Sequence, residues 1–159
     1  MMRTFLAGVS VVAALGMTHA IMGQGTNTVQ FRTRLTPKEI ASLAPTGAGA
    51  GTSGLAGIQT RVLKGDPSKG GLYTIELRVP AHTRIEAHTH PDDRVVTVVS
   101  GIWSFGYGSR YEAKELKPLP PGSFYTEPPD VPHFAQTGKT PVVVYITGYG
   151  PTGTTYVHR

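Results

Sequence analysis

The sequence contains no cysteine among its 159 residues. The fold therefore uses no disulfide, and nitrogen and oxygen atoms must supply the ligands of any bound metal. Long runs of lysine and arginine are also missing, although the formal net charge is +5. A dispersed positive charge argues against a nucleic-acid-binding patch, so we expect no nucleic-acid partner.

The longest apolar stretch is shorter than the roughly 20 residues that a membrane-spanning helix needs. It lies at the N-terminus, where a short basic start, residues 1–3, precedes a mostly apolar segment, residues 4–17. Small residues follow at positions 18 and 20, which is the order of a secretory signal peptide rather than a membrane anchor. We predict cleavage after Ala20, with Gly23 as the alternative, and a periplasmic or secreted protein without a membrane span. Removing 20 residues and one positive charge, Arg3, leaves 139 residues with a net charge of +4.

Glycine and proline are abundant, with 20 and 13 residues, and helical patterns are scarce. Residues 29–35 alternate and predict a short edge strand. Thr36, Pro37 and Glu39 form a capping-box pattern, which predicts a short helix over residues 37–43. Residues 45–57 hold five glycines and are interpreted as a flexible linker or loop. A phosphate-binding loop is disfavoured there because neither a lysine nor a helical pattern follows.

From residue 58 onward the pattern is that of β-strands separated by turns. Residues 72–79 alternate, with Tyr73, Ile75, Leu77 and Val79 predicted to face the core and Thr74, Glu76 and Arg78 to face water. Trp103, Phe105 and Tyr107 share a face and are interpreted as core rather than as a substrate platform. The apolar run 142–146 is predicted to be buried on both faces. Further strands are expected over residues 58–63, around His88, and over 95–99, 102–107, 123–127, 131–137 and 141–147, with an edge strand in the tail, 152–159. Their regular spacing predicts an all-β sandwich or barrel.

Three histidines are the candidate metal ligands. His88 and His90 stand two residues apart where an extended segment ends, so both side chains can point to the same side. His133 follows the proline-rich turn 128–132. Three imidazoles gathered in a small β-fold would make a metal site with open positions. His82 is interpreted as an exposed turn residue outside this site.

These motifs resemble the cupin superfamily. Its first motif is a glycine, five residues, His-x-His, three or four residues, a glutamate, six residues and a glycine. In this chain His88, His90, Arg94 and Gly101 stand in that frame, and Pro132–His133 resembles the second motif. The resemblance extends over residues 58–150. It implies a single-domain cupin-type β-barrel or jelly roll, residues 58–159, preceded by one short helix. Residues 1–20 would be the signal peptide and 21–57 an N-terminal extension with a glycine-rich linker.

The chain departs from the cupin pattern at three positions. His82 replaces the first glycine, Thr137 stands at the asparagine position, and Arg94 replaces the glutamate that is usually the carboxylate ligand. Arginine cannot ligate a metal and stays charged. Three alternatives follow: the site keeps only three histidines, a carboxylate substitutes, or the metal is lost. The candidate carboxylates are Asp92, Asp93 and Glu127.

The remaining site candidates are Arg94, Glu127 and Tyr125. Arg94 either forms an ion pair with Asp92 or Asp93 or binds an anionic substrate group. Glu127 and Tyr125 precede His133 and are candidate acids, bases or hydrogen-bond donors.

The resemblance implies a secreted, metal-dependent enzyme, often a homodimer, that oxidises, isomerises or performs an elimination on a small organic or carbohydrate-derived substrate. The alternative is a non-catalytic cupin that binds a metal or small ligand as a sensor or carrier. One divalent transition metal is expected. Nitrogen ligation favours copper or zinc, with iron, nickel and manganese as alternatives.

Overall fold

The computed structural model describes residues 32–47 and 49–157. The predicted signal peptide, its cleavage sites and the first residues of the predicted strand 29–35 lie outside the described residues. Residues 33–159 belong to one compact unit, in which the described residues form ten strands, one α-helix and one 3-10 turn. No helix among the described residues is long and apolar enough to cross a membrane.

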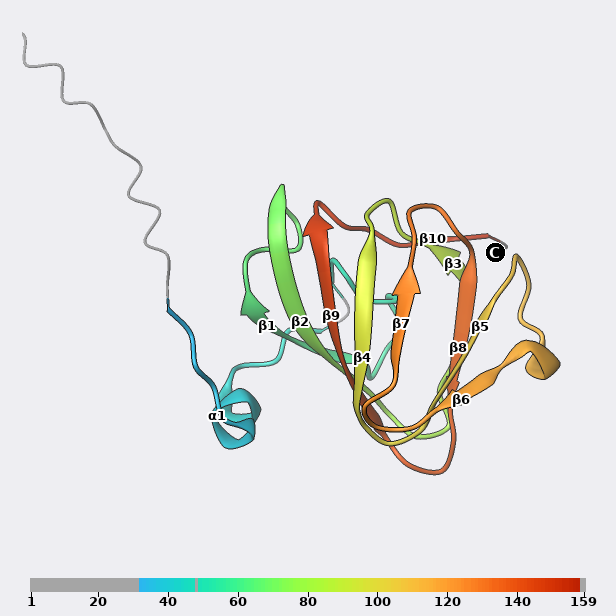
Figure 1. The fold of residues 1–159 in the computed structure, drawn as a ribbon, viewed down its shortest axis with the longest axis horizontal. Coiled ribbons are helices and arrows are strands. Elements are labelled where there is room, and N and C mark those ends of the chain that lie inside the picture. The colour runs from blue at the N-terminus through green and yellow to red at the C-terminus, as the bar shows by residue number, and fades with distance from the viewer. Residues whose placement is uncertain (1–31, 48, 158–159) are drawn as a thin grey trace, which may run out of the picture. The chain divides into compact units, whose positions relative to one another are not determined.

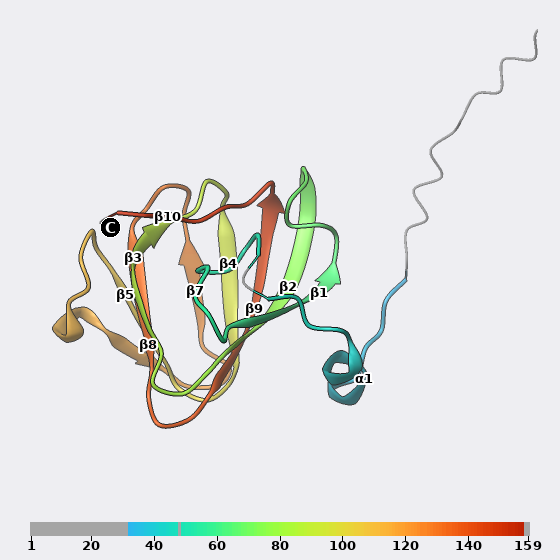
Figure 2. The same ribbon diagram turned by 180° about the vertical axis from the view of Figure 1, so that it is seen from behind.

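The ten strands form two five-stranded antiparallel sheets (Figures 1 and 2). The first sheet has the order β1 (Gln59–Lys64), β2 (Gly71–Val79), β9 (Val142–Gly150), β4 (Arg94–Ser100) and β7 (Phe124–Glu127). The second has the order β10 (Thr155–Tyr156), β3 (Arg84–Thr89), β8 (His133–Thr137), β5 (Trp103–Tyr107) and β6 (Lys117–Leu119). The predicted all-β jelly roll is confirmed, although its two sheets do not close into a barrel.

The core lies between the inner faces of the two sheets. All four predicted inward-facing residues of β2 are buried, as are Val142, Val144 and Ile146 of β9, the central strand of its sheet. From the second sheet, Trp103 and Phe105 of β5 join the same hydrophobic cluster. Alternating apolar side chains on both sheets therefore bury one continuous apolar layer.

Two predictions about side-chain exposure are wrong. Glu76 was expected to face water but is 2% exposed, and Arg61 and Arg78 donate to its Oε1 atom at 3.2 and 2.7 Å. An acidic residue can be buried when cations pair with it. Tyr107 was expected in the core but is 48% exposed. The Tyr107 hydroxyl donates to the carbonyl of Thr126 at 2.6 Å. Thr126 belongs to β7, the edge strand of the first sheet, and no further strand of that sheet lies beyond it to cover Tyr107.

Helix α1 (Pro37–Ser42) begins with the predicted capping box. The Thr36 N–H donates to the Glu39 carboxylate at 2.7 Å, and the Glu39 N–H donates to the Thr36 hydroxyl at 3.3 Å. Arg61 of β1 donates to the Leu43 carbonyl at 3.0 Å and so ties the end of the helix to the sheet. The predicted edge strand is wrong over residues 32–35. Within the described part of the chain, these residues pair with no strand of either sheet.

Two segments beside the sheets lie close to the histidines. The glycine-rich stretch 45–57 was interpreted as a flexible linker or loop, yet Gly51, Thr52 and Ser53 are buried. The tail forms the short edge strand β10, as predicted but over only two residues, and Tyr156 pairs with His88 of β3. Figure 1 shows this tail crossing from the end of β9 to β3.

Candidate metal centre

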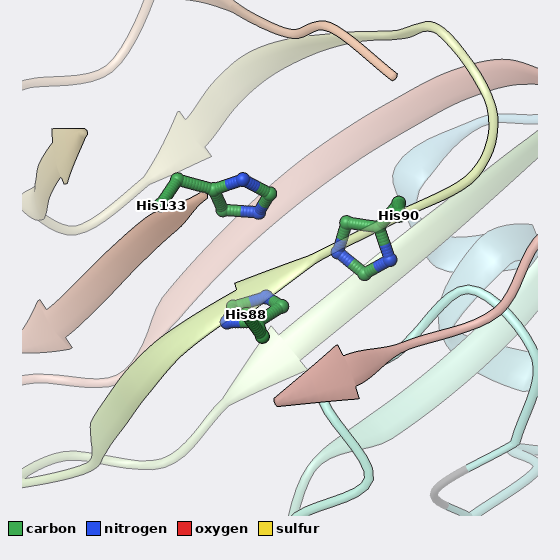
Figure 3. A group of neighbouring side chains, drawn as sticks. All are labelled: His88, His90 and His133. Atoms are coloured by element: carbon green, nitrogen blue, oxygen red, sulfur yellow. The ribbon is translucent and has the colours of Figure 1, made fainter. Parts of the chain in front are cut away.

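The three predicted histidines converge on one point. His88 lies in β3, His90 just beyond its end, and His133 at the start of β8, directly opposite His88 in the β3–β8 ladder (Figure 3). One nitrogen from each ring lies within 4.8 Å of the others. None of the three residues is more than 5% exposed. Two neighbouring strands therefore bring the separate sequence motifs together.

Backbone carbonyls fix the tautomer of all three rings. The Nδ1 atoms lie 2.7, 2.5 and 3.0 Å from the carbonyl oxygens of Glu86, Gly153 and Val131, respectively. A carbonyl only accepts hydrogen bonds, so each Nδ1 carries the ring proton and each Nε2 keeps a lone pair. Metal-binding histidines in proteins are oriented in this way.

The chemistry of the buried nitrogens fits a metal ion. The Nε2 atoms of His90 and His133 have no hydrogen-bond partner among the described residues. Burial lowers the pKa of His88 to about 4 and that of His90 to about 3, and it also lowers the pKa of His133. All three rings are therefore neutral at pH 7, the form in which imidazole binds metals. The histidine triad could hold a metal ion.

Arg94 is paired with Glu127. Its Nε donates to the Glu127 Oε2 atom at 2.6 Å, its Nη2 donates to the same oxygen, and its Nη1 donates to the Gly51 carbonyl at 3.2 Å. The predicted ion pair is therefore present, but Asp92 and Asp93 are the wrong partners. Glu127 stands directly across from Arg94 in the β4–β7 ladder, whereas Asp92 and Asp93 lie in the turn before β4.

Glu127 brings a carboxylate to the histidines. Its Oε1 atom lies 3.8 Å from the His133 Nε2 atom. Burial alone would raise the pKa of Glu127, but the charge of Arg94 and the neighbouring histidines together lower this pKa to about 2. The carboxylate is therefore ionised at neutral pH. Of the three candidate carboxylates, it is the one that lines the histidine cavity.

The other candidates occupy different surroundings. Asp92 is buried and accepts a hydrogen bond from the Tyr73 hydroxyl at 2.7 Å, whereas Asp93 is exposed. Tyr125 lines the cavity, and its hydroxyl accepts a hydrogen bond from the Trp103 Nε1–H at 2.8 Å. Burial raises the pKa of Tyr125 well above its usual range, so the hydroxyl stays protonated. His82 is exposed at a turn, as predicted.

The cavity beside the histidines has a volume of about 20 Å³. A buried cavity of this size holds roughly one water molecule. Its wall includes Gly51 and Ser53 from the glycine-rich stretch, which sequence reasoning did not assign to the site. Composition offers no signal for this placement, because a glycine-rich segment has the same pattern whether it packs against a site or not.

No protein-family model and no curated protein matches the sequence. Solved structures with similar folds include a polyketide cyclase, RemF from Streptomyces resistomycificus, at 15% identity and a TM-score of 0.62. That match covers 81% of this chain and 87% of RemF. An RmlC-like cupin from Shewanella frigidimarina NCIMB 400 matches at 18% identity and a TM-score of 0.52, covering 69% of this chain and 85% of that one.

The chain has the cupin fold. A third cupin-fold match is the DMSP lyase DddQ from Ruegeria pomeroyi DSS-3, at 20% identity and a TM-score of 0.56 over 72% of this chain. The chain spans only 61% of the length of DddQ and 47% of that of another DMSP lyase structure. At such low sequence identities, these similarities establish only the cupin fold. The activity must be inferred from the residues of the site.

Proposed function

We propose that this chain is a metal-dependent cupin enzyme that acts on a small organic or carbohydrate-derived substrate. One observation carries the proposal: three neutral imidazoles, each held through Nδ1 by a backbone carbonyl, gather around one buried cavity. Export to the periplasm or secretion, suggested by residues 1–20, is part of the proposal, as is a homodimer.

His88, His90 and His133 would hold one divalent metal, for which copper or zinc is favoured over iron, nickel and manganese. When bound, such an ion polarises a substrate oxygen or activates water or dioxygen in its open positions. Glu127 contributes a fixed negative charge beside His133. Because its pKa is about 2, it is a weak base, and we infer that it serves as a ligand or charge partner. Arg94 keeps that carboxylate in place, and the protonated hydroxyl of Tyr125 is available to contact the substrate.

Oxidation, isomerisation and elimination are all compatible with this arrangement. By their names, the similar structures include a polyketide cyclase and a DMSP lyase, which supports an enzymatic use of the fold. The second candidate is a non-catalytic metal sensor or carrier. The cavity of about 20 Å³ favours it, because this space admits little more than one water molecule beside the histidines.

The proposal is tested by metal content and metal titration. Protein isolated from the periplasm or the secreted fraction of its native host should contain one transition metal ion per chain by elemental analysis. After the metal is removed with a chelator, the protein should bind it again. His133→Ala should lower the affinity by at least about tenfold, because a ligand is lost from the chelate. His82→Ala, which removes an exposed histidine outside the site, is the control and should bind as the parent does. Absence of binding in the parent, or equal binding by His133→Ala, would show the metal assignment to be wrong.

A further inference from the structure

The Ser53 hydroxyl is a polar group without a visible function. Ser53 is 4% exposed and lines the same cavity as the three histidines. Its Oγ atom has no hydrogen-bond partner among the described residues. Buried polar atoms in proteins are nearly always paired, so the unpaired hydroxyl of this cavity-lining residue calls for a partner that the described residues do not supply.

The backbone around Ser53 is fixed despite its glycine content. Three successive carbonyls accept hydrogen bonds from side chains far away in the sequence: that of Gly51 from Arg94 at 3.2 Å, that of Thr52 from Thr154, and that of Ser53 from Tyr156 at 2.7 Å. Within the loop, the Thr52 N–H also donates to the Gly49 carbonyl at 3.1 Å. A group held in this way is positioned before any ligand arrives, which is how binding sites limit the entropy lost on binding.

Most of the remaining cavity wall is apolar. Leu77, Ile85, Phe105 and Ile146 contribute to it, so few side chains can contact a polar ligand. The polar side chains of the wall other than Ser53 and the histidines are Arg94, Tyr125 and Glu127. Arg94 and Glu127 pair with each other, and the Tyr125 hydroxyl accepts from Trp103 but can still donate. A hydroxyl can donate one hydrogen bond and accept others, so Ser53 can serve either an anion or a neutral oxygen.

We propose that Ser53 is a substrate-contacting residue whose hydroxyl donates a hydrogen bond to the small anionic or oxygen-bearing group that occupies the open metal position. The inference rests on the proposed metal site and assigns a role to the glycine-rich loop. The ligand class is set by the surroundings: a small group with a hydrogen-bond-accepting atom, such as a hydroxide or a carboxylate oxygen, in a cavity that is otherwise mostly apolar.

The test uses copper-loaded protein and fluoride. Fluoride is similar in size to a water molecule, accepts hydrogen bonds strongly and couples magnetically to copper(II), so electron paramagnetic resonance follows its binding directly. Ser53→Ala should bind copper within about twofold of the parent but fluoride about tenfold or more weakly, as expected for the loss of a hydrogen bond to a charged group. Tyr156→Phe, which keeps the Ser53 hydroxyl but frees its carbonyl, should also weaken fluoride binding.

The matched control is Thr60→Val. Thr60 carries another buried hydroxyl without a partner among the described residues, but it lies in β1 and does not line the cavity. This variant should bind copper and fluoride as the parent does. Unchanged fluoride affinity in Ser53→Ala, or no fluoride binding to the copper-loaded parent, would overturn the inference while leaving the metal site intact. Failure of the parent to bind copper, zinc or any other divalent transition metal would instead remove the metal site and this inference together.

Discussion

Arg94 and Glu127 face each other across neighbouring antiparallel strands, and the guanidinium donates two hydrogen bonds to a single carboxylate oxygen. The cupin motif has a glutamate where this chain has Arg94. Here the carboxylate comes from the opposite strand instead, with its second oxygen 3.8 Å from the His133 Nε2 atom. The site therefore retains a carboxylate next to the histidines although its motif position holds a cation.

Loss of the Glu127 charge should destabilise the fold strongly. Glu127→Gln leaves the buried guanidinium of Arg94 without its counter-ion, and removal of one partner of a buried pair costs about 3–5 kcal/mol. The control is Glu112→Gln, which breaks the exposed ion pair with Lys114 and should cost about 0–1 kcal/mol. Urea unfolding of the metal-free proteins measures both values. Similar small losses in the two variants would show that the buried pair contributes little to stability.

Stability should fall at alkaline pH because of Tyr73. Burial raises the pKa of Tyr73 to about 12, although the charge of Arg94 opposes this shift. The pKa in the folded state lies above the unfolded value of about 10, so this contribution is complete below pH 10 and is lost as the pH rises to 12. Tyr73 alone should lower the free energy of unfolding by about 1.4 kcal/mol per pH unit in that window.

Denaturant unfolding at several pH values, with tyrosinate absorbance recorded in parallel, checks this dependence. The slope should become shallower in Tyr73→Phe, which has no phenol to ionise at this position. It should not vanish, because burial also raises the pKa of Tyr125. A parent protein whose unfolding free energy stays level from pH 10 to 12 would contradict the assignment.

The strand pattern and the histidine triad could be predicted because both depend on local spacing. Alternation along residues 72–79 reports burial on one face, and His88 and His90 are separated by the two-residue period of a strand. The Arg94–Glu127 pair depends instead on the register between two strands that are 33 positions apart in sequence. Pattern reasoning paired Arg94 with its sequence neighbours, because no local signal specifies that register.

The errors at Glu76 and Ser53 have the same physical origin. Glu76 sits at a polar position of an alternating strand, yet its side chain is buried, because Arg61 and Arg78 form ion pairs with its carboxylate. Ser53 lies in a stretch whose composition is typical of a linker. Its position is fixed by Arg94, Thr154 and Tyr156, which act on three successive carbonyls from distant parts of the chain. Both placements depend on tertiary contacts that composition does not encode.

Gly148 should tolerate no side chain. A Cβ atom there would lie 2.6 Å from the Asp92 Oδ2 atom and 2.7 Å from the Tyr73 hydroxyl, which are themselves hydrogen-bonded. Gly148→Ala should therefore cost about 1–3 kcal/mol by overpacking. Gly138→Ala is the matched control, because a Cβ atom there meets nothing within 4 Å. Thermal unfolding compares the two variants. Equal melting temperatures would show that the Tyr73 and Asp92 side chains can move aside at little energetic cost.

The last prediction concerns the choice of metal. Nitrogen ligands favour copper or zinc over manganese, and the positive charge of Arg94, which lines the cavity, opposes any cation that Glu127 does not balance. Arg94→Glu changes the local charge by two units and restores the carboxylate of the cupin motif. We expect manganese and iron(II) affinity to rise about tenfold or more relative to copper, measured by competitive titration.

Two further variants distinguish the effect of placing a carboxylate at residue 94 from the effect of changing the net charge. The exchange Arg94→Glu with Glu127→Arg keeps the ion pair and the net charge but moves the carboxylate to β4, so any gain in manganese affinity must come from ligand placement. Arg110→Glu makes the same change in charge at an exposed residue that does not line the histidine cavity, and it should leave metal preference unchanged. If Arg94→Glu binds manganese no better than the parent, residue 94 points away from the metal and the cupin frame misplaces it in this chain. If only the exchange fails, the effect of Arg94 on metal choice is one of charge alone.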